Sequence, residues 1–408
     1  MSVTAADAAS CALHDAGTCR SCPHLSLPMP DQLAAKQSRV AALLAEHIPA
    51  ELWQAPAASA PTGFRNKAKM AVAGTAAHPT LGILDGAGCG VDLRTCPLHV
   101  PAIEAALPVL ADLVTELGLR PYDVPSRRGE LKYVLVTASP DDDLMVRFVL
   151  RSRRYLERLR AAVPDLRRRL PQLAVAAVNI QSVHQAVIEG PEEIVLTEED
   201  RLLMRLSLPS PDGGGQAGRR AGSVELPLYL PTRSFFQTNT AVAEALYATA
   251  RDWAEQAEPA RVWDLFCGVG GFALALAAPG RQVLGVEVSA SAIDGARAAA
   301  DLMGLDPALV RFEAGDARVL DPAAGERAGG VQRPDLLVVN PPRRGIGEQL
   351  ATRIEASGVE RVLYSSCNPR TLAADLAHLP SMRVVRSRLF DMFPHTEHAE
   401  VLVELVRD

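Results

Sequence analysis

Apolar and polar residues follow two different patterns in the two halves of the chain. In the first half, short apolar runs such as Tyr133–Thr137 and Leu144–Leu150 predict strands with few long helices between them. In the second half, apolar runs alternate with helical stretches, beginning with the Ala-rich segment 241–256. Because such alternation indicates a parallel sheet, we predict two domains. Residues 1–230 form a strand-rich α+β unit, and residues 231–408 form an α/β unit.

Two further patterns refine this outline. A helix is predicted from Asp31 to about His47, because four of its apolar residues can share a face. These residues are Leu33, Val40, Leu43 and Leu44. The segment Pro209–Ser223 contains three consecutive glycines and predicts a loop.

Bulk properties restrict the class of protein. The 408 residues are 48% hydrophobic, which fits a globular protein of two or three domains. No apolar run has the length of a membrane span, and the N-terminus lacks a basic segment followed by an apolar one. We therefore expect a cytoplasmic protein without a membrane partner. In a reducing compartment, seven cysteines indicate metal binding or catalysis rather than disulfides.

Three of these cysteines form a compact array near the N-terminus, Cys11-x7-Cys19-x2-Cys22. A fourth ligand is available at Cys89 or Cys96, and we favour Cys96 because a proline follows it, as one follows Cys22. Four thiolates suit a tetrahedral zinc ion or an iron–sulfur cluster, and the spacing alone leaves both open. Three unliganded surface cysteines are the competing interpretation, which their clustering disfavours.

Basic residues are concentrated in one segment of an acidic chain. The net charge is −6, yet residues 151–169 hold eight arginines against Glu157 and Asp165. A solvated helix face would explain this composition, but the pattern also fits an RNA-binding surface.

Polar residues follow successive apolar runs in the second half. A turn with Gly268-x-Gly270-Gly271 follows the first run, Glu287 ends the second, Asp316 follows the third, and Asn340-Pro-Pro follows the fourth. The turn lets the backbone approach a ligand, Glu287 is placed to accept from ribose hydroxyls, and Asp316 is placed to accept from an adenine amine. Each acid could instead cap a helix. Three such residues at successive strand ends favour a Rossmann-like domain that binds S-adenosylmethionine.

Cys367 follows the next apolar run, residues 361–364, and is itself followed by turn residues. A lone cysteine in this place could be a buried packing residue. However, Arg343 stands after Asn340-Pro-Pro, where amine-methylating enzymes have an aromatic residue, and this favours methylation of a pyrimidine C5. That chemistry needs a thiolate that adds to C6 and a base that removes the C5 proton. Cys367 is the candidate nucleophile, and Glu400, which begins the last apolar run, is the candidate base.

Three motifs together resemble the RNA uracil-C5 methyltransferases. They are Asn340-Pro-Pro-Arg-Arg-Gly345, Tyr364-Ser-Ser-Cys-Asn-Pro-Arg-Thr371 and Phe393-Pro-His-Thr-Glu-His-Ala-Glu400. The N-terminal cysteine array is similar to that of family members that methylate 23S ribosomal RNA. The resemblance extends from Cys11 to the C-terminus.

The resemblance implies a role for each matching residue. Cys367 would be the nucleophile, and Glu400 the general base. The methyl donor would be contacted by Gln237, Phe266, Glu287 and Asn340, with Asp316 added from its place after the third run. A [4Fe–4S] cluster would be held by Cys11, Cys19, Cys22 and Cys96. The expected substrate is a hairpin or loop of 23S ribosomal RNA, and we expect the protein to act as a monomer.

Other interpretations make different predictions. Cytosine-C5 enzymes usually carry their cysteine after a proline just past the fourth strand, where this chain has Arg343. Another RNA, such as transfer RNA, could be the substrate. A non-enzymatic iron–sulfur RNA-binding scaffold would tolerate the loss of Cys367.

Overall fold

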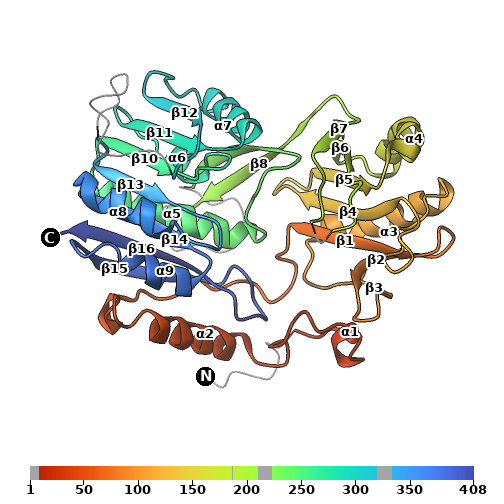
Figure 1. The fold of residues 1–408 in the computed structure, drawn as a ribbon, viewed down its shortest axis with the longest axis horizontal. Helices are drawn as coiled ribbons and strands as arrows, with labels where there is room; N and C mark the ends of the chain where they lie inside the picture. The colour runs from red at the N-terminus through yellow and green to blue at the C-terminus, as the bar shows by residue number, and fades with distance from the viewer. Residues whose placement is uncertain (1–8, 186, 210–222, 319–332) are drawn as a thin grey trace.

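Two seven-stranded sheets lie side by side in the protein (Figure 1). The structure is a computed structural model that describes residues 9–185, 187–209, 223–318 and 333–408. The predicted loop at Pro209–Ser223 falls almost entirely outside these residues. None of the helices in the described ranges is long and apolar enough to cross a bilayer.

The first sheet has the order β3-β2-β1-β4-β5-β6-β7, and only its β5–β6 pair is parallel. Its strands are β1 (Lys67–Gly74), β2 (Pro79–Leu84), β3 (Gly90–Asp92), β4 (Leu131–Ala138), β5 (Leu144–Leu150), β6 (Leu173–Ile180) and β7 (Glu192–Val195). Helices α3 (Pro101–Glu116) and α4 (Leu156–Arg169) contribute apolar side chains to its core. This sheet is the strand-rich unit that the first half of the sequence predicted.

The second sheet has the order β12-β11-β10-β13-β14-β16-β15. Its parallel strands are β10 (Arg261–Leu265), β11 (Gln282–Glu287), β12 (Val310–Ala314), β13 (Leu336–Val339) and β14 (Arg361–Ser366). β15 (Met382–Phe390) and β16 (Glu400–Arg407) complete it as antiparallel strands. The helices of this half are α5 (Thr240–Ala257), α6 (Gly271–Ala275), α7 (Ala290–Leu302), α8 (Gly347–Ser357) and α9 (Pro369–Leu376). The predicted alternation of strands and helices is confirmed.

Segments from the first half also pack against the second sheet. The sequence analysis did not predict the antiparallel pair of β8 (Arg201–Leu208) and β9 (Val224–Pro231). β8 alternates buried and half-buried residues, and the pair shares a core with α5 and α7. Helix α2 (Met29–Leu43) lies along the lower edge, near α9 and β15 (Figure 1). The division at residue 230 therefore stays a prediction about folding units, because the core of the second sheet draws on residues before it.

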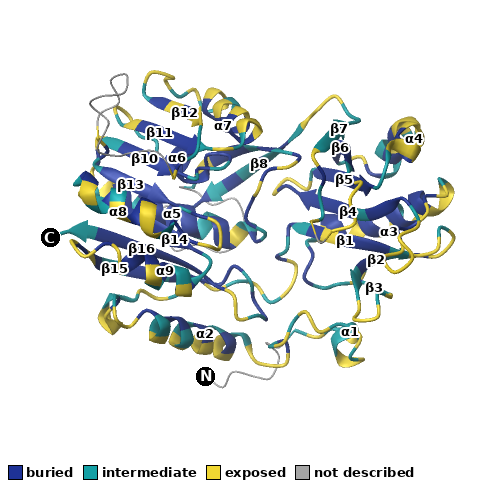
Figure 2. Ribbon diagram, viewed as in Figure 1, coloured by how far each residue is buried: buried dark blue, intermediate teal, exposed yellow. Residues whose placement is uncertain are grey.

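Helix α2 buries a different face from the predicted one. Gln32, Lys36, Val40 and the following Leu44 are buried at intervals of four residues, whereas Leu33 is only partly buried. The predicted apolar face is thus correct for Val40 and Leu44 and incomplete elsewhere. Figure 2 shows the contrast between this inner face and the exposed outer face of the helix. Two polar side chains occupy buried positions that apolar residues usually fill.

The remaining elements are short. Helix α1 (Ala12–Asp15) begins directly after Cys11, and two 3₁₀ turns, η2 (Ala50–Leu52) and η3 (Arg153–Tyr155), connect longer elements.

Candidate active site

The carboxyl ends of the parallel strands meet at one edge of the second sheet. Phe266, Glu287, Asp316, Asn340 and Cys367 each end or closely follow one of strands β10 to β14. Glu400 begins the antiparallel strand β16 at the same edge, because β16 runs against β14. The strand order reverses between β11-β10 and β13, which is where open α/β sheets bind ligands.

The turn after β10 has positive φ angles, which glycine adopts more readily than other residues. Gly268 and Gly270 have φ angles of +55° and +86°, and Phe266, which is not a glycine, has +65°. Beneath the turn, the fully buried Asp264 accepts a hydrogen bond of 2.9 Å from the backbone N of Ala273. Burial raises the pKa of Asp264 to about 8. The turn therefore rests on a protein carboxyl and presents a backbone without side chains at its two glycines.

Glu287 and Asp316, the two acidic residues predicted to contact the methyl donor, accept hydrogen bonds from different groups in this structure. Glu287 accepts one hydrogen bond, of 3.0 Å, from the backbone N of Ser289. Asp316 is bound twice by the Arg318 guanidinium, at 2.9 and 2.7 Å, and once by the Arg318 backbone N. These hydrogen bonds lower the pKa of Asp316 to about 2. Both side chains are thus held as acceptors at the strand ends, but Asp316 already has a cationic partner.

Gln237 lies on a different element, the segment between β9 and α5. The buried Asn66 donates from its side chain to the Gln237 carbonyl (3.0 Å) and to the Thr240 hydroxyl (2.8 Å). Asn66 belongs to the motif Phe64-Arg-Asn-Lys67 at the start of β1, so the first sheet holds this segment in place. The motif therefore joins the first sheet to the segment that leads into α5.

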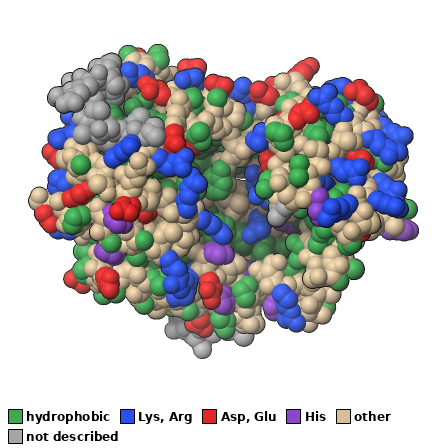
Figure 3. Space-filling model, in the orientation of Figure 1, with side chains coloured by type: hydrophobic (Ala, Val, Ile, Leu, Met, Phe, Trp, Pro, Cys, Tyr) green, Lys and Arg blue, Asp and Glu red, His purple; other side chains and the backbone are tan. Residues whose placement is uncertain are grey.

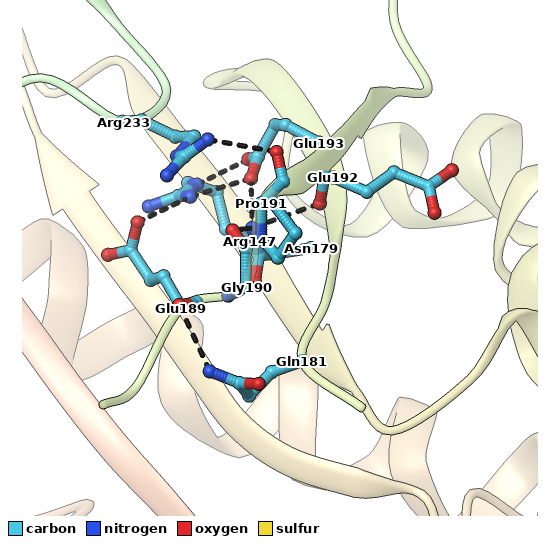
Figure 4. Close-up of polar contacts among 9 residues, drawn as sticks. All are labelled: Arg147, Asn179, Gln181, Glu189, Gly190, Pro191, Glu192, Glu193 and Arg233. Carbon is cyan, nitrogen blue, oxygen red and sulfur yellow. Dashed lines mark hydrogen bonds and ion pairs between the residues drawn. The ribbon is translucent and has the colours of Figure 1, made fainter. Parts of the chain in front are cut away.

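A buried arginine stabilises the first sheet beside the same segment (Figure 4). Arg147 on β5 is 2% exposed, and it binds Glu193 through two nitrogens at 2.6 and 2.8 Å and Glu189 at 3.0 Å. Arg233, just after β9, donates to the Pro191 carbonyl between these two acids. The segment that carries Gln237 is thereby fixed to the first sheet at both of its ends.

Cys367 and Glu400 are neighbours on adjacent strands. β14 and β16 pair Ser365 with Leu402 and Ser366 with Val401, and the next step of this register sets Cys367 beside Glu400. The Glu400 carboxyl is 1% exposed and accepts a hydrogen bond of 2.5 Å from the Ser365 hydroxyl. Burial raises its pKa to about 7, although the bond from Ser365 opposes the shift. A carboxyl with this pKa can both take and release a proton near neutral pH.

Arg343 acts on the thiol of Cys367. Burial and then the Glu400 charge raise the pKa of Cys367, while the charge of Arg343 and a hydrogen bond from its side chain lower it. The Arg343 carbonyl accepts from the side chains of Asn368 (2.9 Å) and Thr371 (3.2 Å), which begin α9. The loop after β13 is therefore bound to the turn that carries the cysteine.

A buried carboxylate on α9 completes this attachment. Asp375 accepts from the Tyr364 hydroxyl at 2.6 Å and from the backbone N atoms of Ile346 and Gly347 at 2.9 and 3.0 Å. It is 4% exposed, and a side chain at Gly345 would overlap it. The sequence analysis missed Asp375, because only a folded chain brings its three partners together.

The N-terminal cysteines lie around one cavity of about 330 Å³. Cys11, Cys19, Cys22 and Cys96 all line it, whereas Cys89 is exposed elsewhere. Burial and the neighbouring thiolates Cys96 and Cys19 raise the pKa of Cys22 to about 11. Within the described part of the chain, no three His, Cys, Asp or Glu side chains are grouped closely enough to hold a metal ion. The structure therefore brings the four predicted cysteines to one cavity and leaves the proposed metal site a prediction.

The positive charge of residues 151–169 is offset by more acidic side chains than the segment itself contains. Four of its eight arginines form ion pairs with acidic residues of α3, α4 and β7. The pairs are Arg153–Glu192, Arg160–Glu157, Arg168–Asp165 and Arg169–Glu116. An RNA contact at this segment stays a prediction, and the net positive charge available for it is smaller than expected.

An exposed aromatic residue was also missed. Phe235 is 69% exposed between the buried Ser234 and Phe236, two residues before Gln237. Single exposed apolar residues are common on protein surfaces, but an exposed aromatic ring can stack on an unpaired base. Its place within Ser234-Phe-Phe-Gln237 is the signal that could have identified it.

Known proteins resemble this chain over nearly its whole length. Residues 227–408 match the tRNA (Uracil-5-)-methyltransferase family. The chain is 48% identical over 401 residues to the 23S rRNA (uracil(747)-C(5))-methyltransferase RlmC of Halothiobacillus neapolitanus, covering 97% of this chain and 99% of that protein. It is 45% identical over 398 residues to the RlmC protein of Escherichia coli, with the same coverage.

A solved structure shares the fold. The tRNA (uracil-54, C5)-methyltransferase of Pyrococcus abyssi, in complex with S-adenosyl-L-homocysteine, aligns with a TM-score of 0.74 at 24% identity. The alignment covers 94% of this chain and 85% of that chain. The predicted α/β methyltransferase fold is therefore confirmed.

Proposed function

The chain belongs to the RNA uracil-C5 methyltransferase family, and we propose that it transfers a methyl group from S-adenosylmethionine to C5 of a uracil in 23S ribosomal RNA. The near-complete alignment with the RlmC proteins supports this substrate, and the names of those proteins specify uracil 747. The observation that carries the proposal is the closeness of Cys367 to Glu400 where the β14–β16 pair ends, at the carboxyl edge of the sheet, so that the Glu400 charge acts on the thiol. A reaction on ribosomal RNA would place the protein in the cytoplasm.

We propose that the two residues act in sequence on the uracil. The Cys367 thiolate adds to C6, and the electrons of the C5–C6 bond make C5 nucleophilic. Bound S-adenosylmethionine supplies the electrophilic methyl group that C5 attacks. The Glu400 carboxylate then takes the C5 proton, the C5–C6 double bond re-forms, and the thiolate leaves. Arg343 would stabilise the thiolate before addition and after release.

The methyl donor is proposed to lie along the strand ends. The two glycines of the turn after β10 offer backbone without a Cβ, as a bound nucleoside requires. Glu287 would accept from the ribose, Asp316 from the adenine amine once Arg318 moves or shares it, and Asn340 would contact the reacting end. Phe266 and Gln237 would pack against the donor from opposite sides of the site.

A [4Fe–4S] cluster is proposed for the N-terminal cavity. The four cysteines line one cavity together, and the resemblance to the family members that methylate 23S ribosomal RNA implies a cluster at these positions. Cationic iron would offset the repulsion between the thiolates. The methylation steps need no electron transfer, so the cluster would stabilise the fold or contact RNA.

We propose that a loop or hairpin of the RNA enters between the two sheets. Figure 3 shows this face of the molecule hollowed where the sheets meet, with Lys and Arg side chains bordering the hollow. The target base must leave its stack to reach Cys367, which unpaired bases do at the smallest cost. Phe235 offers an exposed ring on which a base can stack.

The test is a map of 5-methyluridine in ribosomal and transfer RNA from cells with and without the gene. We expect loss of the methyl group at one position of 23S rRNA, with restoration by the wild-type protein and not by the Cys367→Ala variant. Loss from a transfer RNA alone would overturn the choice of substrate. An unchanged map would overturn the activity.

A further inference from the structure

The loop that leads into Glu400 is held by residues from the other end of the chain. It comprises residues 391–399, which connect β15 to β16, and Glu400 is the first residue after it. Ser365 and the strand register fix one side of Glu400. Loop 391–399 determines the direction in which the chain enters β16 at Glu400.

A buried ion pair fixes the start of this loop. Lys36 on α2 donates from Nζ to Asp391 Oδ1 at 2.5 Å and to the Phe393 carbonyl at 3.0 Å. The side chains of Lys36 and Asp391 are 3% and 1% exposed. A buried ion pair often stabilises a fold no more than apolar side chains of similar volume would. Its presence on the inner face of α2 therefore suggests that a defined loop position matters more than stability.

A second contact fixes the middle of the loop. His395 is fully buried and has a φ angle of +64°, which a residue with a side chain seldom adopts. Gln32, one helical turn before Lys36, donates to His395 Nδ1 at 3.2 Å and accepts from the His395 backbone N at 3.0 Å. The opposite ring nitrogen, Nε2, then carries the proton and donates to the Pro61 carbonyl at 2.7 Å. The neighbouring contacts thus maintain both the unusual backbone conformation and the ring tautomer.

The same loop forms part of the cysteine cavity. Phe393, Pro394 and Thr396 line that cavity together with the four thiols. The His395 carbonyl also accepts from the backbone N of His24, two residues after Cys22. One side of the loop thus faces the N-terminal cysteines, while its end carries the candidate base.

We propose that Lys36 and Gln32 are positioning residues for Glu400, and that they act by holding loop 391–399 in the one conformation that aims the carboxylate at the C5 proton. The inference rests on the proposed function. It assigns helix α2 a role in the last step of the reaction, the removal of the proton and the release of the RNA. We expect no role for Lys36 or Gln32 in the attack by Cys367, because their side chains bind the loop, although helix α2 itself also lies against α9.

The test separates formation of the covalent protein–RNA adduct from its breakdown. The Lys36→Met protein is purified without removing or adding metal. It is then mixed with an RNA hairpin substrate and S-adenosylmethionine. Adduct and methylated RNA are followed through a single turnover on denaturing gels. We expect adduct formation close to the wild-type rate and breakdown slowed by about 10- to 100-fold, as for a misplaced catalytic group. The covalent adduct should accumulate, as we also expect for the Glu400→Gln protein.

Arg386→Met is the matched control. Arg386 forms an ion pair with Glu404, a 2% exposed carboxylate on the same strand as Glu400 but four residues further from the site. We expect Arg386→Met to lower the melting temperature without changing the balance between adduct formation and breakdown. If Lys36→Met does not fold, Gln32→Leu leaves the ion pair intact and tests the same prediction through His395.

Two results would overturn the inference. The first is a wild-type rate of breakdown in folded Lys36→Met and Gln32→Leu proteins. The second is an equal loss of formation and breakdown, which would make α2 a structural support only. If Glu400→Gln itself forms no adduct, the proposed function fails instead, so the two failures are distinguishable.

Discussion

Ser365, near the end of β14, donates its hydroxyl to the carboxyl of Glu400, the first residue of β16, at 2.5 Å. Cys367 directly follows β14, two residues after Ser365. The end of β14 therefore contacts the candidate base and leads into the turn that carries the candidate nucleophile.

Replacing Arg343 should weaken the nucleophile. The charge and hydrogen bond of Arg343 lower the pKa of Cys367, so Arg343→Met should raise it and reduce the thiolate at neutral pH. We expect adduct formation to slow by about tenfold at neutral pH, for a shift of one pKa unit, and to recover partly at higher pH. The measurement is the rate of adduct formation against pH. Arg370→Met is the control, and an unchanged profile for Arg343→Met would contradict the role of Arg343.

The release step should depend on pH through Glu400. Its pKa is raised to about 7, and only the ionised carboxylate can accept the C5 proton. Breakdown of the adduct should therefore speed up as the pH rises through about 7, and adduct should accumulate below that pH. Single-turnover experiments across this range measure the effect. A breakdown rate that is independent of pH would count against Glu400 as the base.

The same carboxyl should make stability depend on pH. Because its pKa is higher in the folded state than in the unfolded state, the folded protein retains a proton that the unfolded chain releases. The stabilisation is complete below the unfolded pKa and is lost as the pH rises through about 7. Glu400→Gln should therefore be more stable than the wild type at pH 8, by up to about 3 kcal/mol, and similar to it at pH 5. Chemical denaturation at both pH values checks this difference, and equal stabilities at pH 8 would contradict it.

The cysteines should differ in their effect on bound iron. Cys96 lines the N-terminal cavity with Cys11, Cys19 and Cys22, whereas Cys89 is exposed outside it. We expect Cys96→Ser to lose bound iron and the visible absorbance of an iron–sulfur cluster, while Cys89→Ser retains both. Iron and sulfide content of anaerobically purified protein is the measurement. Stoichiometric zinc in place of iron would contradict the proposed cluster.

The sequence predicted which residues follow the parallel strands, because that order is local, whereas their catalytic roles stay a prediction. The carboxyl ends of parallel strands all lie at the same edge of the sheet. Glu287, Asn340 and Cys367, which end or follow such strands, could therefore be grouped without a structure. The pairing of Lys36 with Asp391 joins residues 355 positions apart, and no local pattern indicates it. The polar residues Gln32 and Lys36 also conceal the buried face of α2 from an analysis based on hydrophobicity.

The net positive charge of residues 151–169 was overestimated from the sequence, because some of the acidic partners lie far away along the chain. The eight arginines at residues 151–169 are a property of the sequence, but Glu116 and Glu192, which pair with Arg169 and Arg153, come from elements distant along the chain. The β8–β9 pair was missed although β8 alternates buried and half-buried residues, because both strands lie beside a glycine-rich stretch that indicated a loop.

The central claim is that Cys367 bonds to C6 of the uracil and that Glu400 resolves the bond. The most direct measurement is peptide mass spectrometry of the Glu400→Gln protein after incubation with substrate RNA and S-adenosylmethionine, followed by denaturation and digestion. We expect a methylated uridine linked to the peptide that contains Cys367, and no adduct in the Cys367→Ala, Glu400→Gln double variant. A nucleotide linked to another residue, or 5-methyluridine formed by the Cys367→Ala protein, would contradict the claim.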